Sequence, residues 1–314
     1  MSRVLPAQTR AATGAAAPER ALPGRRGAVD LGIGLAGGID RDGHRAAELL
    51  AAGFDSVEFG SVAAGIAGHP DASAATLAAR LAAHRSPAPG AVDAARLGVG
   101  AGVGMHADAG IDVAADAGRE VVIGVGIGRP SGAPLAALAD CWLAGLEAVA
   151  GVADYVSFNL SAAANRPLLA AEWQVLLARS FAAVAAWRDA HAAAGGRRLR
   201  LAAKFPLGTV GEALSGVGLL AADAGFDRLT AVRADDAPDF FRLAALARHV
   251  AQGPLLVAVG GIRHAADVNR ARAAGAAGVQ VHRLFAEQGA ACVARLRSDG
   301  GEKDGKGEKG EKGE

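Results

Sequence analysis

The sequence predicts a (β/α)8 barrel, a closed ring of eight parallel strands covered by helices, with an inserted segment between the second and third strands. Short runs rich in Val, Leu and Ile alternate with Ala-, Leu- and Arg-rich stretches of helical periodicity, which is typical of parallel strands joined by crossover helices. The chain of 314 residues is long enough for one such barrel. The apolar runs end near Ala36, Gly60, Gly126, Asn159, Lys204, Val232, Val259 and His282.

Helical stretches follow most of these runs. We expect helices over residues 41–52, 133–149, 168–194, 210–224 and 238–251. Residues 61–120 are the exception, because they are too many for one loop and one helix. They include the glycine-rich sequence LGVGAGVGMHADAG, and we expect this segment to cross the mouth of the barrel.

The barrel domain is predicted to span residues 28–298, with a segment outside it at each end. Residues 1–27 contain five arginines and three prolines without apolar periodicity, so we expect a disordered leader, for which a targeting peptide is the alternative. Residues 299–314 repeat Gly, Lys and Glu and cannot bury a core, so we expect a disordered charged tail.

Composition argues against several classes of protein. A formal net charge of +1 is unlike that of a nucleic-acid binder. No apolar run approaches the roughly 20 residues that span a bilayer, so membrane association is not expected. The two cysteines, Cys141 and Cys292, provide neither a disulfide framework nor the spacing of a metal site. We therefore expect a cytoplasmic protein whose partner is a small-molecule substrate.

The most informative stretch is residues 255–285, LLVAVGGIRHAADVNRARAAGAAGVQVHRLF. An apolar run enters the pair Gly260 and Gly261, where a glycine turn leaves backbone N–H groups bare before a helix, which suits a phosphate. In a (β/α)8 barrel the loops after strands seven and eight are the usual phosphate site. A turn that binds nothing is the alternative, since paired glycines after strands are common.

Function in a barrel of this kind belongs to the carboxyl ends of the strands. Lys204 ends the fifth predicted strand, where a buried ammonium is costly unless it meets an anion or an electron-rich ring. Asn159 ends the fourth and offers both a donor and an acceptor to a flat heterocycle. The other candidate positions at strand ends are Ala36, Gly37, Arg41, Ser61, Arg129, Ser161, Arg233, Gly260, Gly261, His282 and Arg283.

Six ordered motifs resemble the dihydroorotate dehydrogenase family, and more closely its membrane-associated class. They are GLAGGIDRDG (34–43), GFDSVEFGSV (53–62), DYVSFNLS (154–161), RLAAKF (200–205), VAVGGI (257–262) and AAGAAGVQVHRLF (273–285). The resemblance extends over residues 31–290. It implies an FMN-dependent barrel that oxidises dihydroorotate to orotate in pyrimidine biosynthesis.

The resemblance implies an FMN site with four parts. Ala36 and Gly37 look like the backbone along the isoalloxazine ring. Lys204 looks like the Lys beside the N1 and O2 edge, where a positive charge stabilises the reduced, anionic flavin. Asn159 resembles an Asn that touches flavin and substrate. The fourth part, which resembles the family's phosphate cradle, consists of Gly260, Gly261, His282 and Arg283.

Four cofactor positions differ from the family pattern but can serve the same site. Arg41 stands where the family has a Lys near the phosphate, and Ser61 replaces a Thr. At His282 and Arg283 the family commonly has a Tyr and a small hydroxyl residue, so Arg283 can add a guanidinium to the phosphate site.

The substrate half departs from the family. Ala162 stands where the membrane-associated class has its catalytic Ser, and a methyl group cannot accept a proton. Gly100 and Ala101 stand where an Asn pair is expected, so most amides that bind orotate are absent. Asn165 can replace a lost Asn. Arg233 and Arg129 can pair with a substrate carboxylate, or be surface residues.

Two places can supply a proton carrier. Ser161 is the nearest hydroxyl to the lost base, and with Lys204 it forms the predicted catalytic pair. His106 and Asp108 lie in the glycine-rich loop, where a histidine can act as a base near neutral pH or simply be solvated.

These observations leave four functions open. The first is an FMN-dependent oxidoreductase of the CH–CH class that resembles dihydroorotate dehydrogenase but acts on a different small anionic substrate. The second is a genuine dihydroorotate dehydrogenase with an altered base. The third is a non-catalytic barrel that binds flavin or phosphate. The fourth is a flavin-free barrel that acts on sugar phosphates.

Overall fold

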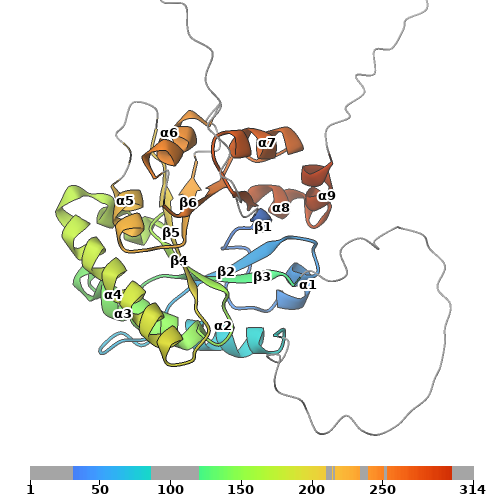
Figure 1. Ribbon diagram of the computed structural model, residues 1–314. Helices are drawn as coiled ribbons and strands as arrows, with labels where there is room; N and C mark the ends of the chain where they lie inside the picture. Colours follow the sequence, from blue (N-terminus) through green and yellow to red (C-terminus); the bar gives the residue numbers. More distant parts are fainter. Residues whose placement is uncertain are drawn as a thin grey trace, which may run out of the picture.

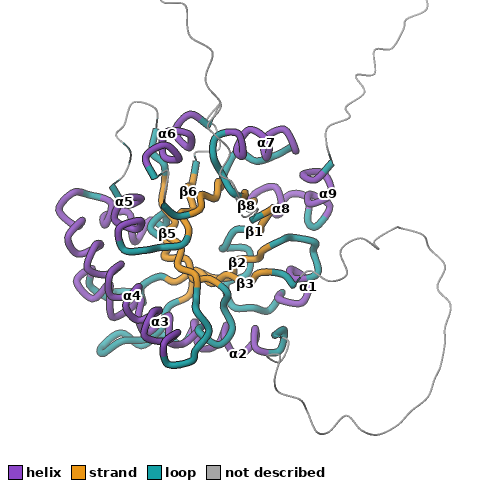
Figure 2. Tube along the Cα trace, in the orientation of Figure 1, coloured by secondary structure: helices purple, strands orange, loops and turns teal. Residues whose placement is uncertain are grey.

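The computed structural model describes residues 31–85, 120–209, 214, 216–233, 240–250 and 253–298. Eight parallel strands pair in chain order and close into a barrel through β8 and β1. Figures 1 and 2 show the ring of strands at the centre with helices outside it. The predicted (β/α)8 barrel is confirmed. The strands are β1 (Gly32–Leu35), β2 (Ser56–Val62), β3 (Val122–Ile127), β4 (Tyr155–Asn159), β5 (Arg200–Pro206), β6 (Arg228–Val232), β7 (Leu255–Val259) and β8 (Gly278–Val281).

Helices follow the strands and cover the barrel. They are α1 (Ala46–Leu50), α2 (Ser73–Ala82), α3 (Leu138–Val149), α4 (Gln174–Ala193), α5 (Val217–Asp223), α6 (Phe241–His249), α7 (Ala265–Ala273), α8 (Arg283–Gln288) and α9 (Ala291–Arg297), with 3-10 turns η1 (Leu135–Ala137), η2 (Ala163–Leu169) and η3 (Ala171–Trp173). The leader, the tail and residues 86–119 of the predicted insertion lie outside the described residues.

Among the described helices, α1, α3 and α4 begin later than the sequence predicts, and for α1 and α4 the local reason is clear. Before α1, the Asp40 carboxylate accepts the backbone N–H groups of Gly43 at 2.9 Å and Arg45 at 2.8 Å, and this holds the chain in a turn. Before α4, residues 163–173 wind as 3-10 turns, and Pro167 lacks the N–H that an α-helix needs.

Within the described ranges no single helix is long and apolar enough to cross a membrane; residues 163–169 and 171–193 pass that test only as a pair bent by 84°.

The strands separate an apolar outer layer from a polar interior. Outward side chains such as Phe59, Val156 and Leu229 belong to the hydrophobic core that the helices cover. On the inside, Glu58 of β2 accepts hydrogen bonds from Lys204 of β5 and Gln280 of β8. Neither β5 nor β8 is a neighbour of β2 in the barrel, so these bonds cross its interior. The buried inward set includes Glu58, Tyr155, Ser157, Lys204, Arg228, Thr230 and Gln280.

Glycine makes room for the largest inward side chain. A Cβ on Gly124 of β3 would lie 2.1 Å from Cζ of Tyr155, so the tyrosine ring occupies the space that a side chain would need. Glycine at this position therefore allows Tyr155 to fill the lumen.

We predict that Gly124→Ala destabilises the protein by about 3 kcal/mol, because overpacking forces the backbone or the ring to move. Urea unfolding measures the loss. Gly151→Ala is the matched control, since nothing lies within 4 Å of a Cβ there. An equal stability of the two variants would contradict this account of the lumen.

Candidate functional site

Two hollows meet at the carboxyl ends of the strands. The smaller, of about 180 Å³, lies over β7 and β8 and is lined by Gly260, Gly261 and Arg283 among others. The larger, of about 500 Å³, is lined by the loops after β1 to β4. Gly38 lines the larger hollow and His282 the smaller one. The two hollows adjoin there, because a Cβ on Gly38 would lie 3.2 Å from Nε2 of His282. The larger hollow includes the predicted site residues Gly37, Arg41, Ser61, Arg129, Asn159 and Asn165, as well as Ala162.

The smaller hollow contains the predicted phosphate cradle. Gly260 and Gly261 have φ angles of +94° and +68°, which side-chain-bearing residues rarely adopt. A Cβ on Gly260 would lie 2.5 Å from the carbonyl oxygen of Arg233, so nothing larger than glycine fits. His282 and Arg283 are exposed at its rim. The geometry is that of a small concave site with exposed backbone and basic side chains.

Arg233 lies in this smaller hollow, although the sequence predicts it among the substrate residues. The residue is only 7% exposed. Its Nη1 donates to the carbonyl oxygen of Gly260 at 3.2 Å, and its guanidinium lies 3.6 Å from the ring centroid of Phe240. The long side chain thus reaches from the end of β6 to the glycine pair, away from Arg129, Asn159 and Asn165.

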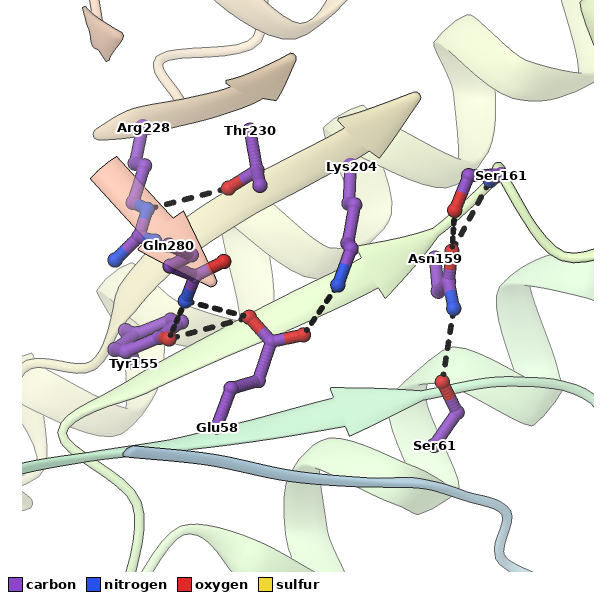
Figure 3. Close-up of polar contacts among 9 residues, drawn as sticks. All are labelled: Glu58, Ser61, Tyr155, Asn159, Ser161, Lys204, Arg228, Thr230 and Gln280. Carbon is purple, nitrogen blue, oxygen red and sulfur yellow. Dashed lines mark hydrogen bonds and ion pairs between the residues drawn. The ribbon is translucent and has the colours of Figure 1, made fainter. Parts of the chain in front are cut away.

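A buried ion pair joins β2 and β5 beneath the two hollows. Lys204 Nζ donates to Oε1 of Glu58 at 3.1 Å, and the two residues are 6% and 3% exposed. Figure 3 shows both side chains inside the barrel, with Tyr155 and Gln280 on the far side of the carboxylate. Lys204 therefore has the anionic partner that its burial requires.

Hydrogen bonds complete the surroundings of Glu58. Its Oε2 accepts the Tyr155 hydroxyl at 3.1 Å and Nε2 of Gln280 at 3.4 Å. The same Nε2 donates to the Tyr155 oxygen at 3.0 Å. Arg228 stacks 4.5 Å from the centroid of the tyrosine ring and donates to Thr230 at 3.2 Å. Together with Lys204, five strands thus contribute to one network around a single carboxylate: β2, β4, β5, β6 and β8.

The network fixes the ionisation of two of its members. Burial by itself raises the pKa of Glu58, but the charges of Lys204 and Arg228 and the hydrogen bonds from Lys204 and Gln280 hold that pKa below its usual value. Burial also raises the pKa of Tyr155, an effect that Arg228 opposes and Glu58 reinforces. The phenol therefore stays protonated and donates to an ionised carboxylate.

Sequence reasoning missed Glu58, Tyr155, Arg228 and Gln280. The available signal was the two-residue periodicity of the strands, which places Glu58 in VEFG on the face opposite Val57 and Phe59. A Cβ on Gly37 would lie 2.8 Å from Oε1 of Glu58. The loop after β1 therefore rests directly on this carboxylate, and a side chain at position 37 would fit only if Glu58 moved.

Hydrogen bonds beside the larger hollow connect five of the predicted residues. Asn159 Nδ2 donates to the Ser61 hydroxyl at 3.1 Å, and Asn159 Oδ1 accepts the Ser161 hydroxyl at 2.6 Å. Asn165 Nδ2 donates to the carbonyl of Asn159 at 2.8 Å. Arg129 contacts Oδ1 of Asn165 at 3.4 Å. These bonds fix the orientation of the Asn159 amide at the end of β4.

Two other features of this hollow bear on the predicted chemistry. Arg129 also donates to the carbonyl oxygens of Ala133 and Ala164, so it ties the loop after β3 to η2. Ala162 lies between Ser161 and η2 and lines the hollow. His106, Asp108, Gly100 and Ala101 lie outside the described residues. The part of the chain that is described contains no cluster of three potential metal ligands.

Comparison with known proteins supports the fold. No protein-family model matches the sequence, and no curated protein matches it significantly. The structure matches dihydroorotate dehydrogenase (DHODH) of Eimeria tenella in complex with ferulenol, with a TM-score of 0.59 and 16% identity over 84% of this chain and 78% of that chain. The ligand-free enzyme from the same organism matches with a TM-score of 0.59 and 18% identity, over 84% of this chain and 81% of that one. Structural similarity to DHODH, predicted from the motifs, is therefore confirmed at the level of the fold.

We predict that Glu58→Gln lowers the free energy of unfolding at neutral pH by on the order of 3 kcal/mol, because it leaves Lys204 buried without its counter-charge. Since folding lowers the pKa of Glu58 below 4.5, its contribution is present above that pH and is lost as the pH falls through the folded value. Denaturant titrations from pH 3 to 7 should show the two proteins converging in acid. A gap that stays constant with pH would contradict the ion-pair assignment.

Proposed function

We propose that this protein is an FMN-dependent oxidoreductase with a DHODH-like barrel, acting on a small anionic substrate other than dihydroorotate. The observation that carries the proposal is the position of Lys204. Its ammonium is held by Glu58 beneath the loop of Gly37, between a glycine-lined basic hollow and the hollow of Asn159. A flat, phosphorylated cofactor requires a hollow for its phosphate, a surface for its ring and a positive charge at the ring edge, side by side.

The residues present fit FMN. The N–H groups of Gly260 and Gly261 would hold the phosphate, and the nearby guanidinium of Arg233 would add a charge-assisted contact. The backbone of Gly37 would lie along the ring, with Lys204 at its electron-rich edge. FMN, when bound, would supply a two-electron acceptor for oxidation of a carbon–carbon single bond to a double bond.

Asn159 and Ser61 are the second group of residues that supports FMN binding. Their side chains are already hydrogen-bonded to each other at 3.1 Å, at the border between ring and substrate. A preformed amide of this kind loses little conformational entropy when a heterocycle binds. Ala36, at the end of β1, would contribute its backbone to the same surface.

The substrate proposal follows from the larger hollow. Arg41 and Arg129 line it with one acidic residue, Asp71, and the excess of positive charge favours an anionic ligand. Ala162 lines it where the family resemblance implies a base, and the nearby Ser161 hydroxyl is directed to Asn159 at 2.6 Å. Asn159 and Asn165 would orient a substrate here. Because the side chains of this hollow differ from those that the family resemblance implies, a substrate other than dihydroorotate is favoured.

We predict that the purified protein binds FMN, seen as a visible flavin spectrum with tight retention on gel filtration. Gly260→Ala should weaken FMN binding at least tenfold, since the new Cβ would lie 2.5 Å from the backbone carbonyl oxygen of Arg233. Gly289→Ala is the matched control, because Gly289 also has a positive φ of +60° but nothing lies within 4 Å of a Cβ there. Absence of flavin binding, with retained affinity for a sugar phosphate, would favour the flavin-free barrel.

We further predict that dihydroorotate, added without oxygen, leaves the bound flavin oxidised in both the native protein and Ala162→Ser. Residue 162 has extended backbone angles, φ −64° and ψ 141°, that a serine adopts readily, so the variant restores the hydroxyl without distorting η2. Bleaching of the native protein would identify a genuine dihydroorotate dehydrogenase. Bleaching of the serine variant alone would show an orotate-type site that lacks only its base.

A further inference from the structure

We propose that Glu58 is a positioning residue that lowers the reduction potential of the bound flavin by partly neutralising Lys204. The proposal rests on FMN binding as proposed above. It concerns a residue for which the sequence motifs suggest no role, and it explains why an acidic side chain is buried in the lumen.

The first support is the isolation of the carboxylate. Glu58 is the only acidic residue within the eight described strands, whereas Lys204 and Arg228 are both inward-facing and buried. Its Oε1 lies 3.1 Å from the Lys204 ammonium. The water-poor interior screens charges weakly, so this negative charge acts on the same region of space as the ammonium.

The second support is the position of Glu58 relative to the β1 loop. The carboxylate lies so close beneath Gly37 that a Cβ there would come within 2.8 Å of Oε1. Gly37 also lines the larger hollow. Only the backbone of Gly37 therefore separates Glu58 from the surface that the proposed function assigns to the flavin ring. The negative charge of Glu58 would change the electrostatic potential at that surface.

The third support is the hydrogen bonding that keeps the carboxylate ionised and in place. Tyr155 and Gln280 both donate to Oε2, on the side away from Lys204. Figure 3 shows Oε1 directed to the lysine and Oε2 to the tyrosine and the amide. The negative charge is thus a fixed part of the barrel floor.

The direction of the effect follows from electrostatics. Reduction adds negative charge to the flavin, so a positive charge nearby raises its potential and a negative charge lowers it. With Glu58 present the net charge of the pair is zero. If Glu58 only held the ammonium in place, its removal would let Lys204 move and the potential would fall. The sign of the shift therefore separates charge tuning from simple support.

The test is an anaerobic titration of the FMN-loaded protein against redox dyes. Glu58→Gln removes the charge and keeps the shape, and we expect its reduction equilibrium to shift at least tenfold toward the reduced form, about 30 mV for a two-electron couple. Glu58→Asp withdraws the charge from Lys204 and should shift the potential less, in the same direction. Ser157→Ala is the control, since Ser157 is a buried lumen residue whose hydroxyl has no hydrogen-bond partner among the described residues.

The outcomes distinguish this proposal from the proposed function. A native protein that does not bind FMN overturns both. A native protein that binds FMN, with a Glu58→Gln potential that is unchanged or more negative, overturns the role of Glu58 and leaves the oxidoreductase proposal standing. If Glu58→Gln does not fold, the sign of the Glu58→Asp shift decides. A shift of equal size in Ser157→Ala also overturns the proposal, because it would show that any change in the lumen alters the potential.

Discussion

The ion pair between Lys204 and Glu58 is the constraint on which the barrel interior depends. Burying an ammonium and a carboxylate costs several kcal/mol per ion, and their attraction offsets this only when the remaining polar atoms are bonded. Tyr155 and Gln280 complete the bonding of the carboxylate. Glu58, Tyr155, Lys204 and Gln280, on the inner faces of β2, β4, β5 and β8, therefore form one network, and removing one of them leaves its partners buried without their bonds.

A polar lumen leaves hydrophobic stabilisation to the layer between strands and helices. The aromatic residues there form a cluster in which Trp142 lies 4.6 Å from Phe158 and 5.6 Å from Phe181, and Phe181 lies 4.6 Å from Phe226, between ring centroids. This cluster joins α3 and α4 to β4. With aromatic residues at only 4% of the chain, most of the outer layer consists of Val, Leu and Ala.

The fold could be predicted from sequence because strand and helix periodicities differ, and because parallel strands end where polar or glycine residues follow apolar runs. Asn159, Val232 and Val259 end their strands as predicted. The network around Glu58 could not be predicted, since it joins residues 58, 155, 228 and 280 across the lumen and depends on the order in which the strands close. The direction of the Arg233 side chain could not be predicted either. The end of β6 before it was predicted correctly, but contacts with Phe240 and Gly260 set the direction of this long, flexible side chain.

The two sides of the site differ in what holds them. Lys204 and Glu58 are strand residues, fixed by the barrel itself. Ser161, Ala162 and Asn165 lie on the segment after β4, where side-chain bonds from Asn159, Asn165 and Arg129 add to the backbone bonds of η2. Substitution of Ala162 leaves each of these bonds in place, because its methyl group makes none of them. The side chains at the rim can therefore change with little cost to the barrel, which is how the charged network of the barrel interior can lie beneath a rim that has alanine at position 162.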